Sequence, residues 1–341
     1  MTEDPNRKDE VLTRPADAAT IESLCEAGHL GPAACEAAQG WLRASRPWWD
    51  WVSRSLLFVG AALVLSGVVF FFAYNWAKMG PVLKFVLIDV ALLACVAGAW
   101  LTGLDRIAGK VLLLCAGLLV GVLLVVYGQT YQTGADAYEL FVGWAVLIAG
   151  WVLISRFAAF WLMWLALVHL GVILYRVQIL THEERWPEIL MFLVLGLLDL
   201  AGVAAREIGA KRGAAWLARR WPGWVMLAAA LVFLTIPTSL LVVVDEYQHP
   251  VTVLAAATWV VALGAGYWFF RYRARDLLSL TLCALSVFAV VVTWIGKGVF
   301  GALEEVWSAC LLFGFAVIAV SSGLGYWLLR TWRAMARQPH G

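Results

Sequence analysis

Charged side chains are scarce in this sequence. Of its 341 residues only 14% are Asp, Glu, Lys or Arg, whereas 63% are hydrophobic, against about 25% and roughly 45 to 50% in soluble domains. A water-soluble fold of this length has too little interior to bury so much apolar surface. The composition therefore excludes an ordinary soluble globular protein and indicates an integral membrane protein.

The sequence also lacks the short motifs that accompany common chemistries. It contains no P-loop, no GxSxG, no HExxH and no Gly-rich dinucleotide fingerprint. Its six cysteines form no CxxC pair and no Cys/His cluster with metal-ligand spacing, and none falls in an expected outer loop. The net charge of +2 favours no binding to nucleic acid. We therefore expect no enzyme activity, no metal, no cofactor and no disulfide framework.

Long apolar runs dominate the chain instead. A membrane-spanning helix needs about 20 apolar residues to cross about 30 Å of hydrocarbon. Ten runs suit this requirement, and the fourth and fifth are expected to form a tight hairpin at Ser155 and Arg156. The sequence thus predicts an all-α polytopic membrane helix bundle with about ten transmembrane helices, over residues 56–74, 82–101, 109–127, 139–155, 157–177, 187–206, 223–244, 250–270, 276–295 and 306–329.

The basic residues indicate which ends of these spans face the cytosol. Lys and Arg resist translocation and collect in short cytoplasmic loops. With the N-terminus inside, only five of the 25 Lys and Arg residues fall on the outer side, namely Lys78, Lys84, Arg176, Arg185 and Lys297. We therefore expect both termini in the cytoplasm, with a polar head over 1–50, a transmembrane domain over 51–335 and a tail over 336–341.

The head has its own pattern. Its start, MTEDPNRKDE, has no apolar h-region behind it, so we expect no cleaved signal peptide. Gly28, Gly31 and Pro32 punctuate two amphipathic segments, IESLCEAGHL and GPAACEAAQGWL, which predicts a short helical pair. Such a pair has a size suited to docking on a partner, although it is only marginally stable in isolation.

Among the Asp, Glu, His, Lys and Arg side chains, three lie well away from the ends of the expected spans: Asp89, His169 and Asp199. An ionised Asp at mid-depth costs about 2.5 to 3.5 kcal/mol, so such groups usually face protein or water. At about 1.5 Å per residue, Asp89 and His169 lie at a similar depth. We hypothesise that these two form a buried polar pair lining a cavity open to the outer face. The alternative is that each bonds a neighbouring helix for packing, with Asp199 capping or bridging near the inner leaflet.

A loop without basic residues, Gly128 to Glu139, is the second candidate site. Its donors and acceptors can satisfy irregular backbone near the bilayer edge, and they can equally bind a polar solute, a headgroup or a partner. The candidate binding surface consists of Gln129, Tyr131, Gln132, Asp136 and Tyr138, with Asn75 and Trp76 at the outer end of the first span expected to pack beneath it.

Three stretches resemble a known family. The head pattern, FFAYNW (Phe71 to Trp76), and GQTYQTGAD (Gly128 to Asp136) followed by LFVGWAVL are similar to the predicted membrane proteins grouped as domain-of-unknown-function family 2157. The resemblance covers residues 20 to 175 or so. It implies a multi-pass protein of the bacterial inner membrane and, as a neighbour, another membrane protein with a GDYxxLxY motif. It implies no catalytic residues.

Three functional classes remain. We favour a non-enzymatic component that assembles with other membrane proteins of the envelope. A secondary transporter of a small solute is the alternative, because ten spans divide into five-plus-five inverted halves. Against it, the halves show no sequence match and no paired Gly or Pro breaks. An intramembrane enzyme is the third and least favoured class, because the sequence shows no nucleophile accompanied by a base or by a set of metal ligands.

Overall fold

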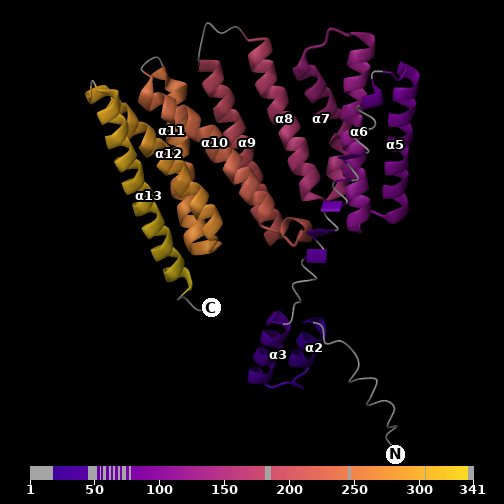
Figure 1. Cartoon of the computed structure of the whole chain (residues 1–341), viewed down its shortest axis with the longest axis horizontal. Coiled ribbons are helices and arrows are strands. Elements are labelled where there is room, and N and C mark those ends of the chain that lie inside the picture. Colours follow the sequence, from indigo (N-terminus) through magenta and orange to yellow (C-terminus); the bar gives the residue numbers. More distant parts are fainter. Residues whose placement is uncertain are drawn as a thin grey trace, which may run out of the picture. The chain divides into compact units, whose positions relative to one another are not determined.

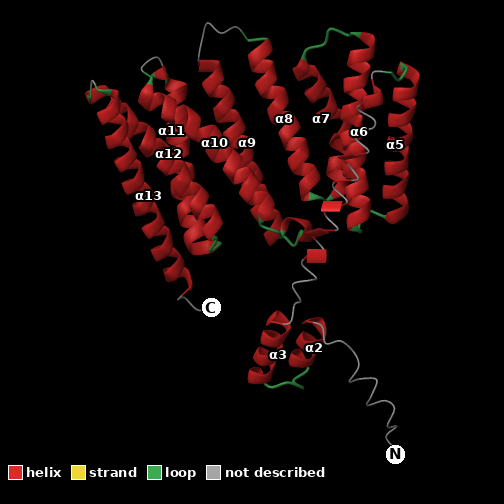
Figure 2. Cartoon of the chain, in the orientation of Figure 1, coloured by secondary structure: helices red, strands yellow, loops and turns green. Residues whose placement is uncertain are grey.

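The computed structural model describes residues 18–44, scattered positions between 52 and 80, and residues 81–180, 186–244, 247–303 and 305–336. The chain divides at Gly80 into two units, Met1–Gly80 and Pro81–Gly341, and each is described by itself. Every element of the described residues is a helix, as Figure 2 shows in red. The prediction of an all-α polytopic membrane bundle is confirmed.

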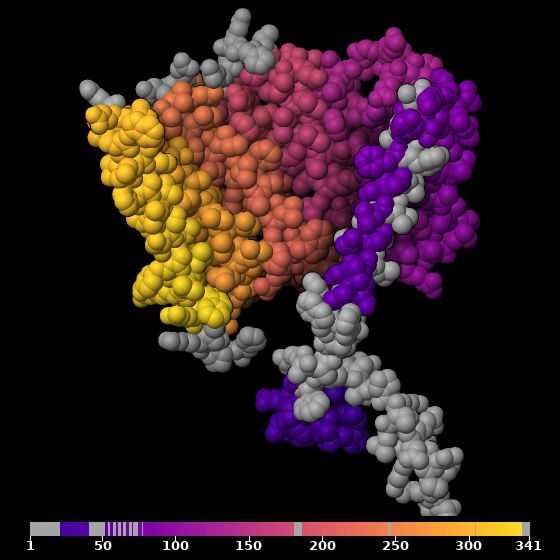
Figure 3. All heavy atoms as spheres, viewed as in Figure 1, coloured from indigo at the N-terminus to yellow at the C-terminus, as the bar shows by residue number. Residues whose placement is uncertain are grey.

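The described part of the second unit contains nine helices that are long and apolar enough to cross a membrane. They pack as neighbours in chain order (Figures 1 and 3), and each succeeding helix reverses direction. Their bounds are α5 (Pro81–Thr102), α6 (Ile107–Tyr131), α7 (Ala137–Ser155), α8 (Ala158–Gln178), α9 (Trp186–Lys211), α10 (Trp221–Val243), α11 (Pro250–Trp268), which continues as the π-helix η3 (Phe269–Arg273), α12 (Leu277–Ala302) and α13 (Val306–Ala336); a 3₁₀ turn, η1 (Ala215–Leu217), precedes α10.

Residues with a left-handed backbone mark several helix ends. Gln132, with φ of 46°, ends α6, and Arg156, with φ of 45°, separates α7 from α8. The helix α6 therefore continues four residues beyond the expected span 109–127, because nothing in Gly128 to Tyr131 interrupts helical hydrogen bonding. The expected loop is reduced to residues 132–136.

The apolar core has two parts. Residues of α5 to α8, among them Leu113, Ile148 and Phe160, form one cluster. Residues of α9 to α12 form two further clusters, around Leu234 and around Leu280. Because α8 packs against both α9 and α10, these three helices join the two parts of the bundle.

The connections lie at two opposite ends of this unit (Figure 1). We call the end with the α5–α6, α7–α8, α9–α10 and α11–α12 connections the basic end and the opposite one the far end. At the basic end are Arg106, Lys110, Arg156, Arg206, Lys211, Arg212, Arg219, Arg220, Arg271, Arg273, Arg275, Arg330 and Arg333, whereas the described Lys and Arg residues towards the far end are Lys84, Arg176 and Lys297. This separation is the one expected from the sequence.

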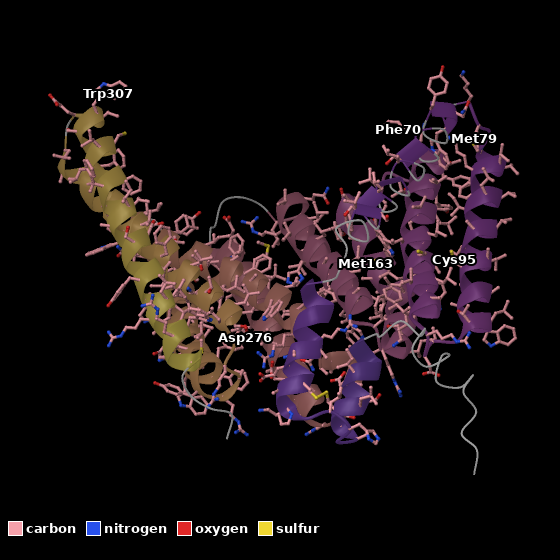
Figure 4. All side chains as sticks on the ribbon, turned by 60° about the horizontal axis from the view of Figure 1, so that its bottom comes forward. Phe70, Met79, Cys95, Met163, Asp276 and Trp307 are labelled. Carbon is pink, nitrogen blue, oxygen red and sulfur yellow. A yellow bond between two sulfur atoms is a disulfide. The ribbon has the colours of Figure 1, made fainter. Side chains whose placement is uncertain are left out.

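In the first unit, α2 (Ala18–Glu26) and α3 (Pro32–Ala44) form the helical pair, with a left-handed Gly28 (φ 73°) in the turn. The expectation of no disulfide is wrong, because Cys25 and Cys35 are bonded (Figure 4), with Cα atoms 6.1 Å apart. The turn between α2 and α3 brings the two cysteines within bonding distance. The cellular compartment alone does not reveal this proximity.

The expected first span, 56–74, is described only in part. The positions described there, such as Leu56, Leu63 and Phe70, are helical, and the remaining ones lie outside the described residues.

Candidate functional site

A buried histidine and a buried aspartate meet where the two parts of the bundle join. His169 lies near the middle of α8, and Asp199 lies near the middle of α9. The Nε2 atom of His169 is 3.1 Å from Oδ2 of Asp199, and the residues are only 8% and 0% exposed. Successive antiparallel helices bring their middles together, so these two polar groups face each other across the α8–α9 interface.

Two further groups hold the imidazole in place. Its Nδ1 atom lies 2.6 Å from the carbonyl oxygen of Leu165, one turn earlier in α8. The ring of Phe233 from α10 stacks on it, with centroids 5.2 Å apart and planes inclined by 14°. A glycine lets α10 approach, because a Cβ atom at Gly196 would lie 2.9 Å from Cγ of Leu234.

The hydrogen bonds determine how many protons the pair holds. A backbone carbonyl only accepts, so Nδ1 of His169 carries a hydrogen and donates it to Leu165. The contact between Nε2 and Asp199 then contains one proton, either on the imidazolium or on the carboxylic acid. Both arrangements are neutral overall, which avoids burying an unpaired charge.

The hypothesis of an Asp89–His169 contact is therefore wrong. Both ring nitrogens of His169 are occupied, by Leu165 and Asp199. Asp89 is exposed on α5, a helix that packs chiefly against α6, whereas α8 packs against α7, α9 and α10. Depth along a helix does not determine which helix is the neighbour. Asp199 does bond a neighbouring helix, as the packing alternative expects, but it does so near the middle of α9 and not at a helix end.

One atom of the pair has no partner. The Oδ1 atom of Asp199 is buried and, within the described parts of the chain, accepts no hydrogen bond. An unused buried acceptor costs about 1 to 3 kcal/mol, so native structures retain few of them. The carboxyl group thus keeps one free acceptor inside the bundle.

The second candidate site lies at the far end, on α6 and the loop to α7. We call Tyr127, Gln129, Tyr131, Gln132 and Asp136 the loop surface, and all five are exposed. The rings of Tyr127 and Tyr131 are 4.8 Å apart, and the two residues remain 51% and 62% exposed.

Tyr138 differs from the other expected loop residues. It lies in the first turn of α7, its ring meets Tyr175 edge-on at 5.1 Å, and its backbone N–H donates to Gln178 Oε1 at 3.1 Å. This residue therefore anchors α7 to the end of α8 and is only half-exposed. Asn75 and Trp76 belong to the first unit, so their packing beneath the loop remains a prediction.

Sequence reasoning missed a buried carboxylate at the basic end. Asp276, labelled in Figure 4, is 8% exposed and precedes α12. It accepts hydrogen bonds from Trp224 Nε1 at 2.6 Å, Ser279 Oγ at 2.9 Å and the backbone N–H of Leu278 at 3.1 Å. An Asp directly before an apolar run is the signal of a helix N-cap and could have identified it.

The geometry of the described residues includes no group of three His, Cys, Asp or Glu side chains suited to a metal ion. Comparison with known proteins then gives one match. Residues 16–161 match the family model "Predicted membrane protein (DUF2157)". The resemblance inferred from the three motifs is confirmed over these residues. No curated protein and no solved structure matches the chain.

Only one of the two candidate sites lies within the residues that match the family model. The match includes the loop surface and ends in the first turn of α8. The His169–Asp199 pair lies beyond it. The family description thus covers a membrane protein without an assigned activity, and it covers the far-end surface rather than the buried pair.

Proposed function

We propose that this chain is a non-enzymatic membrane component that binds another membrane protein of the cell envelope through the loop surface. The exposure of Tyr127 and Tyr131 beside Gln129, Gln132 and Asp136 carries the proposal. Tyrosine combines a large rigid ring with a polar tip, and it is enriched at protein interfaces. The absence of Lys and Arg from residues 128–139 makes a plain anionic headgroup a poor ligand.

The closed geometry of the His169–Asp199 pair supports a structural role over a transport route. Both imidazole nitrogens are hydrogen-bonded, and Phe233 covers the ring. Neither member of the pair lines the apolar grooves beside α8 and α9 or beside α12 and α13 in the described residues. The pair thus serves as a polar clamp between the two parts of the bundle.

The partner that best suits this role is the GDYxxLxY membrane protein implied by the family resemblance. We propose that both proteins lie in the bacterial inner membrane, with the far end of this chain outside the cytosol. The collection of basic residues at the opposite end supports this orientation.

Photo-crosslinking in native membranes tests the proposal. A benzophenone side chain replaces Tyr131, and the control places it at Trp307, another exposed aromatic residue at the far end. We expect a discrete adduct with the GDYxxLxY protein from position 131 and none from position 307. Equal adducts from both positions, or adducts with lipid alone, would contradict the proposal.

A proton-coupled carrier is the second candidate, and the buried, unpartnered Oδ1 atom of Asp199 favours it. Such an acceptor inside a bundle is available to a proton or a solute. Reconstituted vesicles with an imposed pH gradient distinguish the two functions. Uptake that is lost in Asp199→Asn but retained in Asp89→Asn would favour the carrier.

A further inference from the structure

A groove opens towards the basic end of the bundle. It has a volume of about 500 Å³ and lies between α8, α9, η1 and α10. This volume is typical of small-molecule sites, which range from about 300 to 1,000 Å³. The lining is almost entirely apolar and aromatic, and it includes Trp161, Leu165, Leu198, Trp216, Leu217 and Met226.

A buried arginine fixes one edge of the groove. Arg206 lines it, is 6% exposed, and forms an ion pair with Glu207. Its Nη2 group donates to the carbonyl oxygens of Ala218 and Arg219, both at 3.0 Å. These bonds hold the connection between α9 and α10 against the groove, while Glu207 compensates the guanidinium charge.

The connection held in this way is strongly basic. Lys211, Arg212, Arg219 and Arg220 are all exposed, and residues 208–220 contain no Asp or Glu. Glu207 is paired with Arg206, and the Nζ atom of Lys211 lies over the ring of Phe269, 5.4 Å from its centroid. Positive charge that no neighbouring acid of this segment balances therefore lies beside the mouth of an apolar groove.

We infer that this groove binds an anionic phospholipid, with an acyl chain along the apolar lining and the phosphate among Arg212, Arg219 and Arg220. Basic segments directly next to a membrane helix attract anionic headgroups. The rings of Trp161 and Trp216 stack with centroids 6.3 Å apart, at the helix ends where indoles meet the headgroup layer. A zwitterionic lipid has an acyl chain that suits the apolar groove, but it has no net negative charge to match the cations. Free phosphate carries the negative charge but has no acyl chain.

Lipid titration of the purified full chain in detergent, followed by native mass spectrometry, tests the inference. The three ligands are phosphatidylglycerol, phosphatidylcholine with the same acyl chains, and inorganic phosphate. We expect phosphatidylglycerol to bind more tightly than phosphatidylcholine and inorganic phosphate to leave lipid binding unchanged.

Two pairs of variants locate the site. Ala205→Phe fills the groove, whereas Ala204→Phe places the same ring on the neighbouring exposed position outside the lining. The double variant Arg219→Gln, Arg220→Gln removes two cations beside the groove. Its control, Arg330→Gln with Arg333→Gln, removes two exposed cations of α13. We expect a loss of affinity of about fivefold for each cation removed beside the groove.

Several outcomes would overturn the inference. Equal affinity for the two lipids would exclude recognition of the headgroup charge, and displacement of the lipid by inorganic phosphate would indicate a site for the free anion. Equal losses in the groove variants and their controls would place the lipid elsewhere on the protein. Ala201→Phe, at another lining position, replaces Ala205→Phe if that variant does not fold.

Discussion

At the scale of single residues, His169 and Asp199 depend on each other because, within the described residues, each forms an ion pair only with the other. Breaking such a pair leaves a buried group uncompensated, at a cost of about 3 to 5 kcal/mol. We expect His169→Ala and Asp199→Asn each to lower the free energy of unfolding by about this amount. The double variant should lose less than the sum, by about 0.5 to 3 kcal/mol. Unfolding in mixed detergent micelles measures all three values.

The control for this cycle is Asp89→Asn combined with His169→Ala. Asp89 is exposed and makes no contact with His169, so the two effects should add to within about 0.3 to 0.5 kcal/mol. Additivity in the Asp199 cycle, or coupling in the Asp89 cycle, would show that the pair is assigned wrongly.

Two tryptophans in the same helix allow a second test at this scale. The Nε1 atom of Trp161 is buried and has no acceptor in the described segments, whereas Trp164 Nε1 donates to the Ala145 carbonyl at 2.9 Å. Trp164→Phe removes this additional hydrogen bond to a carbonyl inside α7 and should cost about 0.5 to 1.5 kcal/mol. Trp161→Phe loses no hydrogen bond and should cost clearly less. Thermal unfolding of the two variants compares them directly, and a reversed order would contradict the hydrogen-bond assignment.

At the scale of elements, the approach of α10 to α9 depends on a glycine. A Cβ atom at Gly196 would meet Leu234 at 2.9 Å, so Gly196→Ala should lower the stability by about 1 to 3 kcal/mol. Gly150 in α7 has nothing within 4 Å of its Cβ position. Gly150→Ala should therefore raise the stability by up to about 1 kcal/mol, through helix propensity. Detergent unfolding measures both, and equal effects would show that α9 and α10 are not closely packed.

The helical pair of the head depends on its disulfide. Ile21 is the buried hydrophobic residue described in α2, so apolar packing within the pair is limited. A bond that closes a loop of about ten residues contributes about 3 kcal/mol. We expect reduction, or Cys25→Ser, to expose residues 18–44 of the full chain to rapid amide hydrogen exchange.

The control is Cys310→Ser, which removes an exposed free thiol of α13 and should leave exchange in the head unchanged. Unchanged protection of residues 18–44 after reduction would show that packing alone holds the pair. Thiol labelling in cells also reports the compartment, because cytosolic disulfides are usually reduced.

At the scale of the whole molecule, the alternation of the described helices α5 to α13 determines which of their loops share a side of the membrane. Residues 132–136 lie at the far end, and Arg156 and Arg275 lie at the basic end. A topology reporter inserted after Thr133 should be active only outside the cytosol, and one inserted after Arg275 only inside it. Cytosolic activity at Thr133 would overturn the orientation and remove the loop surface from the proposed partner.

Apolar runs were sufficient to predict α5 to α13, since a span is defined by its length and hydropathy within one segment. The same local reasoning misplaced the end of α6, because the polar residues from Gly128 to Tyr131 remain helical. It also excluded the Cys25–Cys35 bond from compartment alone. Which segments form long helices was therefore predictable, whereas the end of α6 and the contacts between segments were not.

The amino-acid sequence by itself determined that this chain crosses a membrane as helices, that its basic residues collect at one end, and that Asp89, His169 and Asp199 are the polar groups inside the spans that need protein or water as neighbours. Only the tertiary structure decided that His169 and Asp199 are each other's partner, with Asp89 left on an exposed face. Depth in a membrane follows from position along a helix, whereas the choice of neighbour follows from how helices pack. The groove beside Arg206 likewise exists only because α8, α9, η1 and α10 come together.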